Sequence, residues 1–125
     1  MKLARSSYSP SYRRETNTMK SIHLIRYSSV LSAQIKLIDK SAQIYSSGFW
    51  DITEARAKAL INGKIYFHLK QLSPSNFGGT ILTADLMTDG PFIGRVQFTF
   101  KSEDECKNIK TPKEGWGREL KFIGF

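Results

Sequence analysis

The sequence lacks the features that would place a protein at once in a structural or catalytic class. It contains a single cysteine, Cys106, so no disulfide can form within the chain and no cysteine cluster can hold a zinc ion. Its apolar runs are far shorter than the roughly 20 residues that span a bilayer. The glycine-containing turn SPSNFGG, residues 73–79, lacks the Lys-Ser/Thr ending of a phosphate-binding loop. We therefore expect a cytoplasmic protein with no membrane partner, no metal site and no cofactor.

The chain also has few of the groups that enzymes use as general acids and bases near neutral pH. His23 and His68 are its only histidines, and no nucleophile pattern lies near either of them in the sequence. No catalytic residue is assigned, and the sequence favours a protein that is not an enzyme. A catalytic His68 stays open as an alternative, because Asp85 or Asp89 could approach an imidazole in the folded chain.

What the chain does have is a net charge of +8, from 19 basic and 11 acidic side chains. Residues 1–20 carry five basic groups and one acidic group, so half of the excess lies at the N-terminus. Such a balance favours polyanionic partners through long-range attraction and counterion release. Composition therefore predicts RNA or DNA as the first class of partner, with a protein partner as the second.

Length and patterning indicate one domain preceded by an arm. Residues 1–18 are rich in Ser, Tyr and Arg and nearly free of aliphatic side chains, which predicts a flexible basic arm. An Arg- and Ser-rich start is also typical of organellar transit peptides. A third interpretation is that the natural start is Met19 and that these residues are an upstream extension. Residues 19–125 fit a single domain.

One short helix is expected over residues 52–61. Asp51 and Glu54 are spaced as a capping box, in which each side chain can satisfy a backbone NH at the start of a helix. Ala55 and Ala59 recur at helical spacing on the expected apolar face. The helix is expected to end at the following Asn-Gly pair, since both residues tolerate the left-handed backbone conformation that closes a helix.

The other periodic stretches predict strands. Clean alternation in RVQFTF places Val96, Phe98 and Phe100 on one face, which is typical of a strand with one buried side. Residues 40–50 are predicted to form a loop that ends on the aromatic pair of SSGFW. We predict an α+β fold, a small curved sheet or pseudobarrel of five to six mostly antiparallel strands with one main short helix. The expected strands cover 21–27, 34–38, 64–72, 80–87, 93–100 and 118–125.

Two consecutive phrases carry a family resemblance over residues 47–100. The helix and strand TEARAKALINGKIYFHLKQ, followed by the turn and strand SNFGGTILTADL, resemble the PUA-like superfamily, which includes the ASCH and EVE domains. The Lys-Ser-Glu-Pro start of many EVE domains is absent. The resemblance implies a single PUA-like domain over 19–125, a pseudobarrel that binds RNA or a modified base in a pocket beside the helix and the barrel mouth.

Nine residues from four segments are candidates for binding a nucleic acid or another ligand. They combine aromatic faces that can stack on a base, cations that can contact phosphate and a glycine that lets the backbone approach a ligand. The candidates are Ser47, Trp50, Tyr66, His68, Lys70, Phe77, Gly78, Trp116 and Arg118.

Each candidate segment also has a purely structural interpretation. Phe49 and Trp50 would form a hydrophobic staple against the helix. The strand face that carries Tyr66 would be solvated, and the glycine turn would only connect two strands. For Trp116, which lies between glycines and near cations, the sequence favours a binding role.

The leading hypothesis is a non-enzymatic nucleic-acid-binding domain that recognises RNA, or a modified or flipped base held between Trp50, Tyr66 and Trp116. It requires the SSGFW loop, the Tyr66 strand face and the late loop to share one mouth. The alternatives are a small hydrolase or nuclease that uses His68, and an accessory factor that interacts with another protein.

Overall fold

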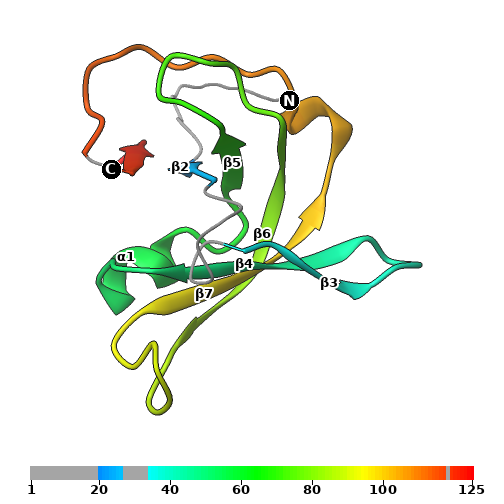
Figure 1. Cartoon of the computed structure of the whole chain (residues 1–125), viewed down its shortest axis with the longest axis vertical. Coiled ribbons are helices and arrows are strands. Elements are labelled where there is room, and N and C mark those ends of the chain that lie inside the picture. The colour runs from blue at the N-terminus through cyan, green and yellow to red at the C-terminus, as the bar shows by residue number, and fades with distance from the viewer. Residues whose placement is uncertain (1–19, 27–33, 118) are drawn as a thin grey trace, which may run out of the picture.

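A computed structural model describes residues 20–26, 34–117 and 119–125, which form seven strands, one α-helix and one short 3-10 helix (Figure 1). The arm predicted at 1–18 and the candidate Arg118 lie outside the described residues. In chain order the elements are β2 (Ser21–Ile25), β3 (Lys36–Asp39), β4 (Ile44–Trp50), α1 (Glu54–Ala59), β5 (Lys64–His68), β6 (Phe77–Leu86), β7 (Val96–Ser102), η2 (Asp104–Cys106) and β8 (Leu120–Ile123).

The seven strands form one open sheet in the order β3-β4-β7-β6-β5-β2-β8. All neighbouring strands are antiparallel except β2 and β5, which run parallel. The predicted pseudobarrel of five to six strands is therefore wrong, because the described sheet has seven strands, is mixed, and does not close between β3 and β8. The sequence prediction omits β4, whose polar Ser-Ser-Gly centre interrupts the alternation that identifies a strand.

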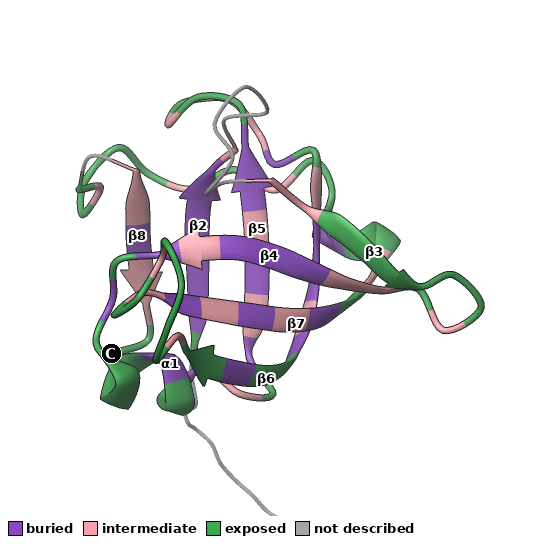
Figure 2. Cartoon of the chain, turned by 60° about the horizontal axis from the view of Figure 1, so that its bottom comes forward, coloured by how far each residue is buried: buried purple, intermediate pink, exposed green. Residues whose placement is uncertain are grey.

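The long strand β6 belongs to both halves of the sheet, because its first part pairs with β5 and most of its length pairs with β7. The half with β4 and β7 crosses over the half with β5, β2 and β8 (Figure 2). At Gly78 and Gly79 the backbone of neighbouring strands lies where a Cβ atom would have to be. A Cβ on Gly78 would collide with the carbonyl oxygen of Ile65, and one on Gly79 with that of Lys101. Both positions therefore require glycine for close strand packing.

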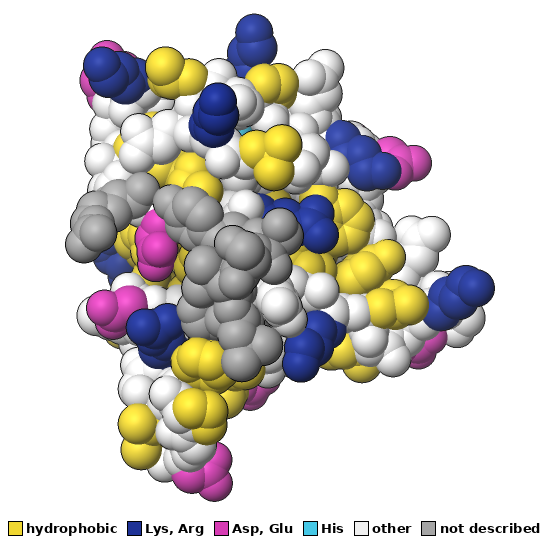
Figure 3. Space-filling view, viewed as in Figure 1, with side chains coloured by type: hydrophobic (Ala, Val, Ile, Leu, Met, Phe, Trp, Pro, Cys, Tyr) yellow, Lys and Arg dark blue, Asp and Glu magenta, His cyan; other side chains and the backbone are white. Residues whose placement is uncertain are grey.

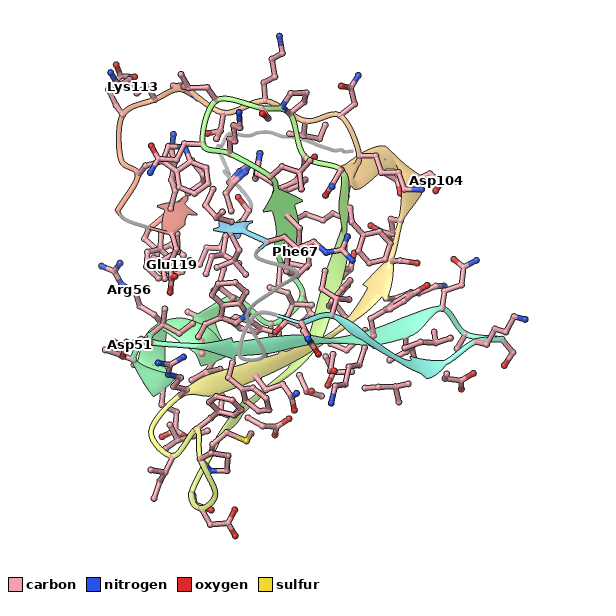
Figure 4. The ribbon with its side chains drawn as sticks, in the orientation of Figure 1. Asp51, Arg56, Phe67, Asp104, Lys113 and Glu119 are labelled. Carbon is pink, nitrogen blue, oxygen red and sulfur yellow. The ribbon has the colours of Figure 1, made fainter. Side chains whose placement is uncertain are left out.

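The core lies between the two halves and is built from the inward-facing positions of the strands. Ile65 and Phe67 point inward from β5, while Phe98 and Phe100 point inward from β7, as the alternation in RVQFTF predicts. Figure 4 shows Phe67 in the middle of the molecule. Burying each of these large side chains stabilises the fold by roughly 1.5 to 3 kcal/mol. The outward-facing residues of the same strands are the ones left for a binding site.

Helix α1 begins two residues later than the sequence predicts. Its N-cap is Thr53, whose hydroxyl accepts a hydrogen bond from the Arg56 NH at 3.2 Å, so the capping box predicted at Asp51 does not form. Of the apolar face that the sequence predicts, Ala55 and Ala59 are exposed, whereas Ile52 and Leu60 are buried, together with Ala57. In the part of the chain that the structure describes, no helix has the length and apolar character needed to cross a membrane.

Candidate functional site

The outer face of β2, β5 and β8 carries a row of polar side chains that the strand register aligns. His23 lies opposite Tyr66 on β5 and opposite Lys121 on β8. The imidazole of His23 stacks on the Tyr66 ring, with 4.6 Å between centroids and 21° between planes. We call these three residues, together with His68 and Trp116, the histidine cluster.

The two imidazoles of the histidine cluster are joined by a hydrogen bond of 2.7 Å between Nδ1 of His23 and Nε2 of His68. Nδ1 of His68 lies 2.8 Å from the carbonyl oxygen of Ser73, which can only accept, so this nitrogen carries a proton. In a neutral His68 ring Nε2 is then the acceptor, and Nδ1 of His23 donates. Both tautomers are therefore fixed by the fold.

Burial keeps both imidazoles neutral. His23 is 3% exposed and His68 is fully buried. Burial, the neighbouring His68 ring and the Lys121 ammonium lower the pKa of His23 to about 3. Burial also lowers the pKa of His68, and the hydrogen bond to the Ser73 carbonyl offsets only part of this shift. At neutral pH neither ring carries a charge.

The segment that follows η2 covers the histidine cluster. The Trp116 ring meets His68 edge to face, with 5.5 Å between centroids and 88° between planes. Its Nε1 is buried and has no hydrogen-bond partner among the described residues. Ser75 ties this segment to the turn after β5, because its hydroxyl accepts the Ile109 NH at 2.9 Å and its carbonyl accepts the Asn108 NH at 2.6 Å. The cluster thus lies between a sheet face and a pinned loop.

These contacts indicate a structural role for the histidine cluster. His68 has no nitrogen free to take a proton from a substrate, so the geometry gives no support to a hydrolase or nuclease with His68 as general base. Lys121 is also engaged, since its Nζ donates to the carbonyl of Pro112 at 2.6 Å. Within the described ranges, no group of three or more His, Cys, Asp or Glu side chains is placed to hold a metal ion.

The outer face of β3, β4 and β7 is organised by a β-bulge in β4. Ser46 pairs with Thr99 and Phe49 pairs with Gln97, so β4 uses three residues to advance as far as β7 advances in two. The extra residue turns Phe49 to the same outer face as Ser46 and sends Trp50 into the core. The bulge therefore decides which aromatic residue of SSGFW meets solvent.

Ser47 and Trp50 hold this bulge in place. The Ser47 hydroxyl accepts the Phe98 NH at 2.9 Å and donates to the carbonyl of Gly48 at 3.1 Å. Nε1 of Trp50 donates to the carbonyl of Ser47 at 3.0 Å. Gly48 has a φ of 87°, in the left-handed region that favours glycine. Ser47 and Trp50 are both buried, so neither can stack on or bind a ligand from outside.

Phe49 forms one wall of a cavity of about 270 Å³, which we call the phenylalanine cavity. Its ring stacks on Phe92, from the turn between β6 and β7, with 4.5 Å between centroids and 18° between planes. The guanidinium of Arg95 lies 5.9 Å from the centroid of the Phe92 ring. The lining of the cavity includes Gln34, Lys36, Ser46, Phe49, Phe92 and Gln97.

The polar side chains of the phenylalanine cavity have no hydrogen-bond or ion-pair partners among the residues that the structure describes. Ser46 is 6% exposed, yet its hydroxyl makes no hydrogen bond to any described residue. The amides of Gln34 and Gln97 and the ammonium of Lys36 are likewise unpartnered within the described ranges. These groups are therefore available to a ligand that enters the cavity.

A second cavity, of about 450 Å³, lies at the open seam between β8 and the link from β4 to α1. Leu120 and Phe122 line it from β8, and Arg56 lines it from α1. The Arg56 guanidinium already packs on two rings, at 4.7 Å from the centroid of Phe122 and 5.3 Å from that of Phe125. Figure 4 shows Arg56 and Asp51 on this flank. The polar groups here are exposed, so this cavity gives a ligand less direction than the phenylalanine cavity does.

The structure brings together three of the nine candidates and separates the others. Tyr66, His68 and Trp116 meet in the histidine cluster. Ser47 and Trp50 support the bulge in the other half of the sheet, so the single mouth expected from the sequence does not form.

Three further candidates, Lys70, Phe77 and Gly78, do not join either site. Lys70 is exposed beyond the end of β5. Phe77 packs on Tyr45 and Phe100 at 5.0 and 5.8 Å between centroids, and Gly78 is buried in the sheet. The last of the nine candidates, Arg118, lies outside the described residues.

Sequence reasoning missed most of the phenylalanine cavity. Gln97 left a signal, because it is the outward position between the inward-facing Val96 and Phe98 of RVQFTF. The stacking of Phe49 on Phe92 left no signal in the sequence, because it depends on the bulge.

Charge does not mark one face of the molecule. The described residues include 14 basic and ten acidic side chains, and the ion pairs among them are Lys64 with Glu103 at 2.5 Å and Lys107 with Asp104 at 3.2 Å. Figure 3 shows basic side chains scattered over the visible face, with acidic ones between them. Most described cations are thus without an ion-pair partner, but they do not form a stripe that would identify a site.

Comparison with known proteins found no match to the chain among family models, curated proteins or solved structures. The resemblance to the PUA-like superfamily stays a prediction, and the function must be argued from the site.

Proposed function

We propose that this chain is a non-enzymatic module that binds single-stranded nucleic acid on the outer face of β3, β4 and β7. One observation carries the proposal: the stacked pair of Phe49 and Phe92 stands at the wall of a cavity beside two cations, Lys36 and Arg95, that have no ion-pair partner among the described residues. Aromatic faces bind bases and nearby cations bind the phosphates of the same strand.

The energetics of the site suit a single strand better than a duplex. Base stacking on an aromatic side chain stabilises binding by about 1 to 3 kcal/mol per base, and it requires a base that is free of its complement. Phe49 and Phe92 are half-buried and held by the sheet and its turn, so little side-chain entropy is lost when a base stacks on them. The net charge of +8 adds long-range attraction that salt screens.

The test is the titration of fluorescent single-stranded RNA and DNA decamers with the full chain, followed by anisotropy at two salt concentrations. We expect affinity to fall steeply with added salt, and Phe49→Ala to weaken binding about tenfold at fixed salt. Phe125→Ala is the matched control, because it removes an exposed aromatic ring far along the chain from the cavity. Binding to no single-stranded pool, or equal loss in both variants, would refute the proposal.

A protein partner is the second candidate function. Strand β3 lies at one end of the sheet, and Leu37 and Ile38 on it are 52% and 58% exposed. An exposed edge strand is a template for pairing with another chain. The discriminating experiment is a pull-down after nuclease treatment: a specific protein retained by the wild type and lost from Ile38→Lys would favour this function.

A further inference from the structure

We infer that the segment over the histidine cluster, residues 108–117, is a cover that acid releases from the outer face of β2, β5 and β8 while the sheet stays folded. We call it the cover segment. None of its residues lines the phenylalanine cavity, so this device is independent of the proposed function. Geometry carries the inference: two hydrogen-bonded imidazoles lie against Trp116 and beside Lys121, and both of these residues hold the cover segment in place.

The cover segment is fastened differently at its start and over the cluster. At its start, two of its backbone NH groups bond to Ser75. Over the cluster, Trp116 packs on the imidazoles and Lys121 donates to the carbonyl of Pro112. Near its end, the amide of Gln71 donates to a backbone carbonyl at 3.0 Å in a solvent-exposed bond. Segments held by few packing contacts and by exposed hydrogen bonds are the ones that open locally.

Each proton that the two imidazoles take up disturbs the contacts beneath the cover segment. The first can be held on His23, which still donates from Nδ1 to Nε2 of His68, but its charge is then buried opposite the Lys121 ammonium. The second must go to Nε2 of His68, so that two NH groups face each other across 2.7 Å and the bond between the rings is lost. Both costs fall when water reaches the rings, which requires the cover segment to lift.

The charged imidazoles would have no carboxylate partner among the described residues. The titratable side chains that face His23 are Tyr66 and His68 on β5 and Lys121 on β8, and none of them is negative between pH 4 and pH 7. From the cover segment, the uncharged ring of Trp116 faces both imidazoles. Accordingly, burial, His68 and Lys121 lower the pKa of His23 to about 3, and burial lowers the pKa of His68.

Hydrogen exchange of the two indole NH groups, followed by NMR, reports on cover and sheet in one sample. Nε1 of Trp116 is buried without a partner among the described residues, whereas Nε1 of Trp50 is bonded to Ser47 inside the sheet. Each exchange rate is divided into that of a free indole at the same pH to give a protection factor. We expect Trp116 to be less protected than Trp50 at both pH 7 and pH 5.

The protection factor of Trp116 should also fall at least tenfold from pH 7 to pH 5. Release of His23 alone, from a pKa of about 3 to the ordinary 6.5, favours the open state by about 25-fold over this interval. His23→Gln keeps a donor toward His68 but lacks the titrating ring, so its fall should be at least threefold smaller. Lys113→Gln is the control, because it removes an exposed charge from the cover segment itself and should behave as the wild type.

Three results would overturn the inference. Equal protection factors for Trp50 and Trp116 at pH 5 would mean that the sheet opens together with the cover segment. A Trp116 protection factor that does not change with pH would show that protons do not release it. An equal change in His23→Gln and Lys113→Gln would remove the imidazole from the process. If His23→Gln does not fold, the comparison of the two indoles in the wild-type chain decides.

Discussion

The two outer faces of this sheet differ in what they do with their polar groups. The histidine cluster uses both nitrogens of His68 and covers them with a pinned segment. The phenylalanine cavity leaves the hydroxyl of Ser46 and the amide of Gln97 open to solvent or ligand. Titratable and aromatic residues gather at the first face, where one buried donor, Nε1 of Trp116, also lacks a partner among the described residues, whereas at the second face the unpartnered polar groups line a cavity. Residue type alone is therefore a poor guide to a site, and polar groups that line a cavity are a better one.

The largest expected effect on stability separates two neighbouring residues, Phe49 and Trp50. Trp50→Ala should lower the free energy of unfolding by about 3 to 5 kcal/mol, because it empties a fully packed core position and removes the indole bond to Ser47. Phe49→Ala should lower it by about 1 kcal/mol, since it loses mainly one stacked contact. Urea unfolding of both variants measures the difference. Equal losses would show that Phe49 also belongs to the core.

Acid should weaken the face with the histidine cluster. The folded chain holds the pKa of His23 at about 3, while an unfolded chain titrates near 6.5. Below pH 6.5 the unfolded state therefore binds protons that the folded state does not, and stability falls as pH falls toward 3. Between pH 7 and pH 5, His23 should account for a loss of about 2 kcal/mol.

The measurement is urea unfolding at pH 7 and pH 5, for the wild type and for His23→Gln. The variant keeps a donor for Nε2 of His68 but lacks the titrating ring, so its stability should depend less on pH. A wild type whose stability is the same at both pH values would show that the buried imidazole pair does not exist in solution.

Trp116→Ala tests which face binds nucleic acid. It removes the ring that packs on both imidazoles, at 6.3 Å from His23 and 5.5 Å from His68 between centroids. We expect the free energy of unfolding to fall by about 2 kcal/mol and the affinity for single-stranded decamers to stay within twofold. A tenfold loss of affinity in a folded variant would instead place the site at the histidine cluster, as the sequence first suggested.

The smallest expected effect concerns one charge. Lys36→Gln should weaken binding about threefold at moderate salt and lower the slope of log affinity against log salt by about 1, because one phosphate contact is lost. Lys113→Gln is the control, since Lys113 stands at an outer corner in Figure 4 and outside the cavity. A slope unchanged by Lys36→Gln would show that this ammonium does not contact phosphate.

The sequence could predict features that depend on neighbouring residues, but not features that depend on pairing between distant segments. The alternation of RVQFTF was enough to place Phe98 and Phe100 in the core. The convergence of Tyr66, His68 and Trp116 was expected as part of a shared mouth, but His23 completes it through the parallel pairing of β2 with β5, which no local pattern reveals. Seven strands in an open order also depend on pairings between distant segments, and these set the fold class.

The phenylalanine cavity was harder to predict from the sequence. Strict alternation would assign one of Phe49 and Trp50 to the core but cannot say which, and it would oppose Ser46 to Phe49. The answer depends on one extra residue whose bulge is stabilised by a hydrogen bond from the Phe98 NH, 51 positions along the chain. Glycine at position 48 was the only local trace of it, and glycine has several other uses in a strand.

This bulge also determines how the chain can vary in length. A deletion of a single codon at position 47 or 48 would leave the reading frame intact and change no other residue. It would remove the extra residue, so that Ser46 and Phe49 would lie two positions apart, pair regularly with β7 and stay on the same outer face. A one-residue deletion elsewhere in β4 would instead exchange inside for outside for every side chain on one flank. The bulge is therefore the point at which β4 can lose a residue without inverting its surface.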